Sequence, residues 1–331
     1  MVYIYKKPIG NKNYYYLRAS EKKGKKFVTK DIAYLGSTID EVKSNIDKLA
    51  KYKEQIRKSY KVINLLLESN HFLEKAKQMK LKKDSFLKNQ TDEVEACKIH
   101  YNEVFNKKDE LTKKEILKNF IIEFSYNTAS IEGNTINLDE ARNLLNENLT
   151  PKDKTLREIY DLQNTEKVFF NMINTKLKEE INHNLIINIH DNLLENIDER
   201  KGYRTADIRV LRSNFDASPG KYVKTDMDLL LKWYDENKNM HPLALALIFQ
   251  HKFEKIHPFM DGNGRTGRMI MNLILLKNKM PPIIIHKKTR KEYLEVMRKA
   301  DECNLWKIEE NYADLINYGI NEFLDYWNMF L

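Results

Sequence analysis

The chain has 331 residues, of which 57 are Lys or Arg and 48 are Asp or Glu, and its formal net charge is +9. This length is sufficient for a full hydrophobic core and for two or three structural units. Two cysteines, Cys97 and Cys303, are too few for a disulfide framework, and no apolar run is long enough to cross a membrane. With no signal peptide in the sequence, these features indicate a reduced, cytoplasmic protein that is not bound to a membrane. The histidines and cysteines form no zinc-binding pattern.

Residues 1–37 are predicted to form a small basic antiparallel β unit. Aromatic and β-branched residues alternate with lysines in YIYKKPIGNKNYYYLRAS and KKFVTKDIAYLG, and glycines separate the runs. Lysines among tyrosines can bind nucleic acid through phosphate contacts and base stacking. The alternative is a lysine-rich solvent face with the tyrosines packed on the opposite side of the sheet. Because lysine is abundant along the whole chain, the composition favours this alternative and leaves the first open.

Residues 38–112 are predicted to be a helical linker or accessory region. Apolar residues from Val42 to Leu66 fall at helical spacing, and the stretch from Ile39 to Asn106 contains no glycine or proline. Long amphipathic helices outside a catalytic core pack on it or on a second copy of the chain, so a homodimer stays open. Thr112 and Glu115 have the spacing of a capping box and predict the start of the next helix.

The segment TASIEGN at 128–134 predicts the end of that helix. Thr128 and Glu132 are four residues apart and share one helix face. Gly133, followed by Asn134, is typical of a helix stop.

Two β-prone runs surround the turn-rich segment SNFDASPG and predict a β-hairpin. Ile208, Val210 and Val223 are the candidate hairpin positions. An exposed hairpin edge can bind an extended peptide by strand addition.

The dodecapeptide HPFMDGNGRTGR at 257–268 contains the candidate catalytic, metal-binding and phosphate-binding residues. The apolar run that begins at Met269 predicts a helix, so the turn Gly262–Gly264 lies at a helix N-terminus, where N–H groups and the helix dipole favour an anion. Arg265 and Arg268 are three apart and can both reach a phosphate. His257 is the candidate general base for a hydroxyl nucleophile. The carboxylate of Asp261 is the candidate ligand of Mg²⁺ or Mn²⁺.

HPFMDGNGRTGR matches every fixed position of the Fic family signature HPFx[D/E]GNGRxxR, and the chain resembles this family from about Lys113 to the C-terminus. The resemblance implies a mainly α fold in which residues 113–331 form a helical Fic core with a short β-hairpin flap. It also implies transfer of AMP from ATP to a Ser, Thr or Tyr hydroxyl of a target protein, with release of pyrophosphate.

The resemblance implies a role for each residue of the dodecapeptide. His257 is the base, Asp261 the metal ligand, and the turn Gly262–Gly264 the anion hole, with Asn263 touching phosphate directly. Arg265 faces the β-phosphate and Arg268 the γ-phosphate.

Two other segments acquire roles in the same way. TASIEGN resembles the inhibitory motif [S/T]xxxE[G/N] of Fic proteins, in which the glutamate, here Glu132, pairs with the second signature arginine, Arg268, and blocks the γ-phosphate. The hairpin resembles the flap that docks the target. Tyr293, in PPIIIHKKTRKEYLEVM, is the expected nucleoside contact, and Leu294 stands where many relatives carry a second aromatic residue.

Three classes of function stay open on the sequence. The favoured one is an autoinhibited protein adenylyltransferase, with self-modification as an additional outcome. The second is removal of AMP, or transfer of another nucleotide or phosphoryl-linked group, at the same site. The third is a regulator that binds nucleic acid through the basic N-terminal unit.

Overall fold

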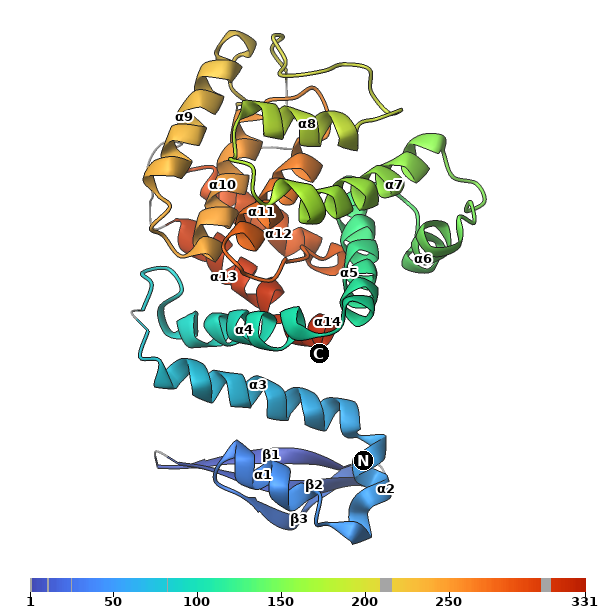
Figure 1. The fold of residues 1–331 in the computed structure, drawn as a ribbon, viewed down its shortest axis with the longest axis vertical. Helices are drawn as coiled ribbons and strands as arrows, with labels where there is room; N and C mark the ends of the chain where they lie inside the picture. Colours follow the sequence, from blue (N-terminus) through green and yellow to red (C-terminus); the bar gives the residue numbers. More distant parts are fainter. Residues whose placement is uncertain (1, 11, 25, 82, 209–215, 305–310) are drawn as a thin grey trace.

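The computed structural model describes residues 2–10, 12–24, 26–81, 83–208, 216–304 and 311–331. An antiparallel sheet with the strand order β1-β2-β3 occupies the N-terminus (Figure 1). Its strands are β1 (Val2–Ile9), β2 (Lys12–Lys23) and β3 (Lys26–Gly36). Gly10 and Gly24 follow β1 and β2 with φ angles of 58° and 63°, a left-handed conformation that suits tight hairpin turns. The predicted β unit is therefore confirmed.

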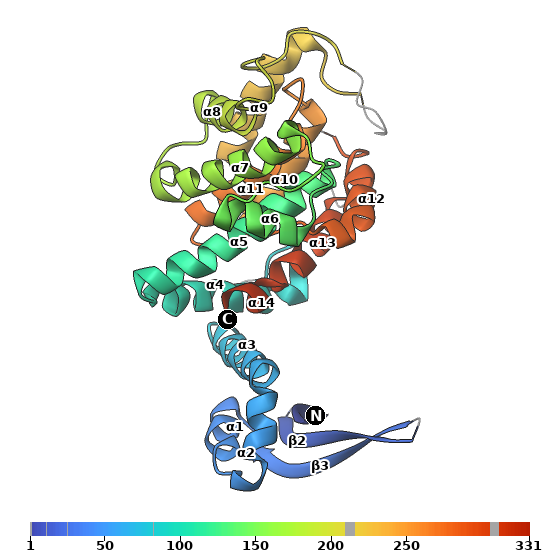
Figure 2. The same ribbon diagram turned by 90° about the vertical axis from the view of Figure 1, so that its right-hand side faces the viewer.

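Three helices follow the sheet and cover one of its faces, namely α1 (Ile39–Ile46), α2 (Lys53–Lys58) and α3 (Tyr60–Gln78). Alternate residues of β1 and β2, among them Val2, Ile4 and Leu17, form a separate hydrophobic cluster with Val42 of α1 and Leu67 of α3. The sheet and the first helices thus share one core, and α3 continues toward the rest of the molecule (Figures 1 and 2).

The remaining helices form the main body. They are α4 (Thr91–Glu103), α5 (Glu110–Ile131), α6 (Leu138–Glu147), α7 (Leu156–Asn171), α8 (His183–Leu193), α9 (Val223–Glu236), α10 (Pro242–Ile256), α11 (Asn263–Lys277), α12 (Arg290–Ala300), α13 (Tyr312–Leu324) and α14 (Tyr326–Phe330). Short helical turns connect these elements along the chain. The 3₁₀ turns are Ala50–Tyr52, Lys88–Gln90, Phe105–Lys107, Gly220–Tyr222 and Lys287–Thr289, and Met172–Lys176 is a π-helical extension of α7. The predicted mainly helical fold is confirmed. No helix in the described ranges is long and apolar enough to span a membrane.

The predicted capping box at Thr112 and Glu115 is wrong. Helix α5 begins one turn earlier, because the Asp109 side chain accepts a hydrogen bond from the Thr112 N–H at 2.9 Å and caps the helix there. The end of α5 agrees with the sequence: Glu132 is its C-cap and Gly133 has a φ of 109°. This end of α5 reaches the functional site.

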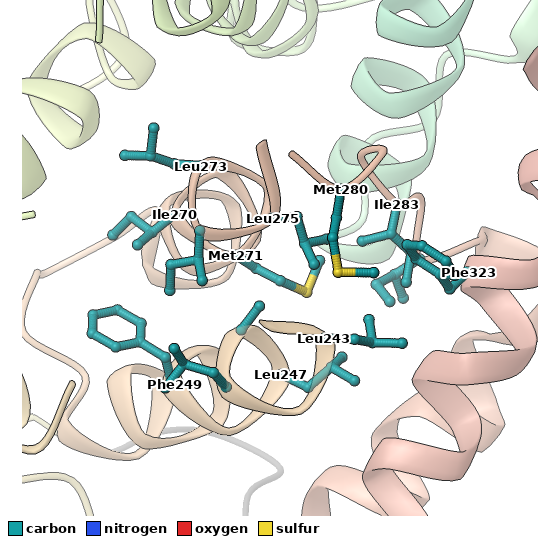
Figure 3. Close-up of a cluster of buried hydrophobic side chains, with 14 of the residues drawn as sticks. Leu243, Leu247, Phe249, Ile270, Met271, Leu273, Leu275, Met280, Ile283 and Phe323 are labelled. Carbon is teal, nitrogen blue, oxygen red and sulfur yellow. The ribbon is translucent and has the colours of Figure 1, made fainter. Parts of the chain in front are cut away.

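Helices α10 and α11 form the centre of the body. Leu243, Leu247 and Phe249 of α10 lie with Ile270 and Met271 of α11 in one fully buried cluster (Figure 3). Burial of this kind stabilises by roughly 25 cal/mol per Å² of apolar surface, so the two helices hold their relative positions firmly. The short connection between them, residues 257–262, is therefore carried on rigid supports.

Candidate active site

The connection between α10 and α11 is braced from within. Phe259 is completely buried and its ring stacks on His190 of α8, with centroids 3.6 Å apart and an interplanar angle of 4°. Asn263 accepts from the Phe259 N–H and donates to the Phe259 carbonyl, both at 2.9 Å. Both polar ends of the Asn263 side chain therefore hold the loop, and the direct contact of Asn263 with phosphate stays a prediction.

His257 has the left-handed conformation, with φ 54° and ψ 61°, at the C-terminus of α10. Its Nδ1 lies 3.2 Å from the Glu254 carbonyl, and since a carbonyl only accepts, Nδ1 carries the proton and Nε2 of the neutral ring is left with its lone pair. Burial, together with the positive charge of Arg204, lowers the pKa of His257. The ring is therefore neutral at neutral pH, as a general base requires.

Arg204, which sequence reasoning missed, fixes the backbone around His257. Its guanidinium donates to the carbonyls of His257 at 2.7 Å, Ala206 at 2.8 Å and Ser218 at 2.5 Å. Its own N–H donates to the Pro258 carbonyl at 2.9 Å. Through these hydrogen bonds, Arg204 links the segments on either side of residues 209–215 to His257, whose backbone has the left-handed conformation. The only sequence signal is a Gly-Tyr-Arg triplet at 202–204, which alone indicates no contact.

The N-terminus of α11 presents main-chain donors. The Gly262 N–H donates to Asp261 Oδ1 at 2.6 Å, and the first bond of the helix runs from Thr266 to Gly262 at 2.9 Å. Within the described residues, the N–H groups of Asn263, Gly264 and Arg265 have no acceptor, as the first turn of a helix dictates. Together with the helix dipole they form an anion site.

The carboxylate of Glu132 lies over this anion site. A Cβ added to Gly264 would be 2.2 Å from Glu132 Oε1, so the absence of a side chain at Gly264 leaves the space in which the carboxylate sits. Burial would raise the pKa of Glu132, but the charges of Arg268 and Arg265 outweigh it and hold that pKa below its ordinary value. Glu132 is therefore ionised, and its side chain is still 43% exposed.

Arg268 is 1% exposed and is bound on one side by α5. Its Nη2 donates to Glu132 Oε1 at 2.6 Å, and its Nε donates to Thr128 Oγ1 at 2.7 Å. Burial disfavours the charge, but Glu132 and Glu254 stabilise it, so the pKa of Arg268 is raised. The pairing predicted between Glu132 and Arg268 is present, and Thr128 holds the same guanidinium.

Glu254 and Tyr293 lie beneath Arg268. Burial and the nearby Glu132 raise the pKa of Glu254 to about 7, against the opposing charge of Arg268. Tyr293 is 1% exposed, accepts from Gln250 Nε2 at 2.7 Å and donates to Glu254 Oε1 at 3.4 Å. The Tyr293 ring lies in the core below the arginine, and its contact with a nucleoside stays a prediction.

Asp261 and Arg265 face helix α7. Asp261 pairs with Arg157 and lies 3.5 Å from Arg265, whose other terminal nitrogen binds Asp161. Burial would raise the pKa of Asp261, but the two arginines lower it overall, so the carboxylate is ionised. Arg157 and Asp161 were missed by the sequence reasoning, although their spacing of four residues places them on one face of α7.

The three predicted hairpin positions differ in their surroundings. Val210 lies outside the described residues, and neither flank, 201–208 or 216–222, contains a strand. Ile208 is half-buried, whereas Val223 is the first residue of α9 and fully buried. Val223 is therefore wrong as a docking position: the chain passes from Pro219 through a 3₁₀ turn directly into α9, which buries Val223 in the core.

Comparison with known proteins gives concordant matches. Residues 180–275 match the model of the Fic/DOC family. The protein adenylyltransferase fic-1 of Caenorhabditis elegans is 30% identical over 183 residues, which cover 54% of this chain and 36% of that protein. The protein adenylyltransferase Fic of Drosophila ananassae is 29% identical over 209 residues, covering 60% and 41% respectively. The chain thus spans less than half the length of these curated relatives.

Solved structures share the fold. A Fic domain-containing signaling protein from Bacteroides thetaiotaomicron superposes with a TM-score of 0.63 at 20% identity, covering 71% of this chain and 95% of that one. Fic-1 from C. elegans superposes with a TM-score of 0.60 at 19% identity, covering 88% and 80%. At these identities the likeness establishes the fold.

Proposed function

We propose that the chain, whose residues 180–275 match the model of the Fic/DOC family, is a protein adenylyltransferase. It transfers AMP from ATP to a hydroxyl side chain of a target protein and releases pyrophosphate. The observation that supports this most strongly is the combination in one loop of a neutral base, His257, with a helix N-terminus whose N–H groups have no acceptor among the described residues. The names of the curated relatives support the same activity.

His257 takes the proton of the target hydroxyl. The oxygen of that hydroxyl forms a bond to the α-phosphorus, the bond from this phosphorus to the bridging oxygen breaks, and pyrophosphate leaves with the electron pair. The proton moves to Nε2, since Nδ1 already donates to the Glu254 carbonyl. The lowered pKa of His257 keeps the ring available for this transfer at neutral pH.

The N-terminus of α11 binds the phosphates. The main-chain donors of Asn263, Gly264 and Arg265 stabilise the charge that develops as pyrophosphate departs. Arg268 supplies a buried positive charge at the same end of the helix. In this proposal Arg265, held between Asp161 and Asp261, assists from the other side.

Asp261 fits a divalent cation that arrives with the nucleotide. Among the described residues no three acidic, histidine or cysteine side chains gather into a metal site, and Mg²⁺ commonly uses one or two carboxylates plus substrate phosphates. Asp261 is ionised, and the guanidinium of its partner Arg157 is 57% exposed, so it is free to move away. Bound Mg²⁺ would neutralise charge on the phosphates.

Glu132 is proposed to inhibit the enzyme by competing with the nucleotide. Its carboxylate lies where a Cβ of Gly264 would be and pairs with Arg268, so it occupies the anion site with the charge that a terminal phosphate would bring. The Glu132 side chain is 43% exposed, and solvent screens partly exposed pairs. An inhibitory ion pair that is partly screened by solvent can be displaced by movement of the end of α5.

The test is transfer of label from ATP carrying a labelled α-phosphate. Glu132→Gly is expected to raise labelling of target or self roughly tenfold or more, as removal of a competing state predicts. Glu147→Gly is the matched control, because Glu147 is an exposed glutamate at the end of α6. Addition of His257→Ala to the Glu132→Gly chain is expected to abolish labelling.

The outcomes separate the two claims. Equal labelling with and without Glu132 would overturn the inhibition and leave the transferase. No labelling in any form, with ATP or with another nucleoside triphosphate, would overturn the transferase. Because the Glu132 carboxylate reaches both solvent and the anion site, removal of AMP is the second candidate. Loss of AMP from a modified target with the wild type but not with Glu132→Gly would favour it.

A further inference from the structure

The outer face of the N-terminal sheet carries most of the tyrosines of this unit. Inward-facing Val2, Ile4 and Leu17 are buried against the helices, so their strand neighbours point to the opposite face. The tyrosines on this outer face are Tyr3, Tyr5, Tyr14, Tyr16 and Tyr34. Tyr15 alone packs inward, and it is completely buried. The tyrosines are therefore not packed beneath a lysine face, which removes the interpretation that the composition favoured.

Three of these tyrosines form a row across the sheet. Tyr5 pairs with Tyr16 on β2, and Tyr16 pairs with Tyr34 on β3. The rings of Tyr16 and Tyr34 have centroids 5.4 Å apart, and the guanidinium of Arg18 lies 3.5 Å from the Tyr5 ring centroid. Tyr34 is 54% exposed. Neighbouring strands lie about 4.8 Å apart, so the three rings follow one another across the sheet. Tyr5 and Tyr16 are half-buried, and Arg18 covers one face of Tyr5.

Positive charge surrounds this row on the same face. Lys7, Lys12 and Lys22 are exposed and share the alternation of the tyrosines. The acidic residue Asp31 on this face is paired with Arg18 at 2.6 Å and also attracts Lys7, whereas Lys12 and Lys22 form no ion pair among the described residues. Phe27, directly opposite Lys22, extends the aromatic surface along the β2–β3 hairpin and is 72% exposed. The hairpin reaches beyond α1 and α2 (Figure 2).

We propose that this outer face binds single-stranded nucleic acid, with unpaired bases stacked on the row Tyr5, Tyr16 and Tyr34 and with phosphates bound by Lys7, Lys12 and Lys22. Aromatic rings that share one sheet face with exposed lysines form a surface that can accept base faces and phosphates together. A duplex keeps its base faces stacked on one another and offers none to the tyrosines. An acidic protein would satisfy the lysines and would have no use for the aromatic row.

The test is fluorescence anisotropy of the full chain with labelled oligo-dT and oligo-U of about 15 nucleotides, beside a duplex of equal length. The two single strands distinguish DNA from RNA. Tyr16→Leu and Tyr34→Leu keep the apolar bulk, remove the rings and are expected to weaken binding at least tenfold, since stacking contributes roughly 1–3 kcal/mol per base. Tyr60→Leu is the control, because Tyr60 is an exposed tyrosine on α3, away from this face.

Salt dependence tests the lysines. Three phosphate contacts predict a fall in affinity of about 20-fold between about 50 mM and about 200 mM salt, and a shallower dependence in Lys7→Glu. Thermal unfolding of each variant confirms that the sheet is intact. Absence of binding to either single strand at low salt would overturn the proposal. Equal weakening by Tyr60→Leu, preference for the duplex, or complete competition by polyglutamate would also overturn it.

Discussion

Replacement of Arg204 with alanine is expected to destabilise the protein and to disturb the catalytic base. Arg204 is 4% exposed, and no carboxylate lies within ion-pair distance of it among the described residues. Three of its hydrogen bonds to carbonyls are 2.8 Å or shorter, and a fourth, to Ile256, is 3.3 Å. Burial lowers the pKa of Arg204, against the opposing charge of Asp207.

The magnitude follows from these contacts. A hydrogen bond from a charged donor contributes roughly 1.5–3 kcal/mol, and the uncompensated burial removes part of that gain. With about 1 kcal/mol left for each of the three short bonds, Arg204→Ala should lower the free energy of unfolding by about 3 kcal/mol. His257 is also released from a left-handed conformation that costs about 1–2 kcal/mol for a residue with a side chain, so the imidazole loses its position.

Two measurements check this reasoning. Urea denaturation gives the free energy of unfolding, and labelling in the Glu132→Gly background gives the rate of adenylyl transfer. Arg204→Lys should recover about half of the stability and little of the rate, because an ammonium reaches one or two of the carbonyls. Arg200→Ala is the control, since Arg200 is exposed and forms a surface ion pair with Asp198, and it should change the stability by about 0.5 kcal/mol or less. If Arg204→Lys matched the wild type in both measurements, the charge alone would be sufficient and the argument from geometry would fail.

Two further predictions concern residues around Arg268 and the loop. The pKa of Glu254 is raised from 4.5 to about 7, so the folded state binds the carboxyl proton more tightly than the unfolded state, and the free energy of unfolding falls by about 3 kcal/mol as pH rises from about 4.5 to above 7. Glu254→Gln should flatten this fall when urea denaturation is measured across that pH range. An unchanged slope would refute the assignment of the fall to Glu254. Asn263→Asp keeps the acceptor for the Phe259 N–H but turns the donor into an acceptor facing the Phe259 carbonyl. The substitution should therefore lower the free energy of unfolding by about 2–3 kcal/mol and remove most of the labelling. Labelling at the Glu132→Gly level would show that the loop does not need the hydrogen bonds of the Asn263 side chain.

The sequence alone determined the elements with strong local signals. Alternation and glycine turns predicted the small antiparallel β unit, and the apolar run after Arg268 predicted a helix with its N-terminus at the glycine turn. The spacing of Thr128 and Glu132 placed both on one face of α5, and the same guanidinium contacts both. Such signals lie within a few residues of one another, where local geometry decides the outcome.

Only the tertiary structure decided which distant groups complete the site. Arg204, His190, Arg157 and Asp161 come from segments 53 to 104 residues away from their contacts in the loop, and no local pattern records such a separation. The structure also showed packing roles for three of the predicted site residues. The Asn263 side chain braces the loop, Tyr293 is buried below Arg268, and Val223 belongs to the core of α9. In each case packing decided the orientation of a side chain whose chemical type the sequence had made suitable for a ligand.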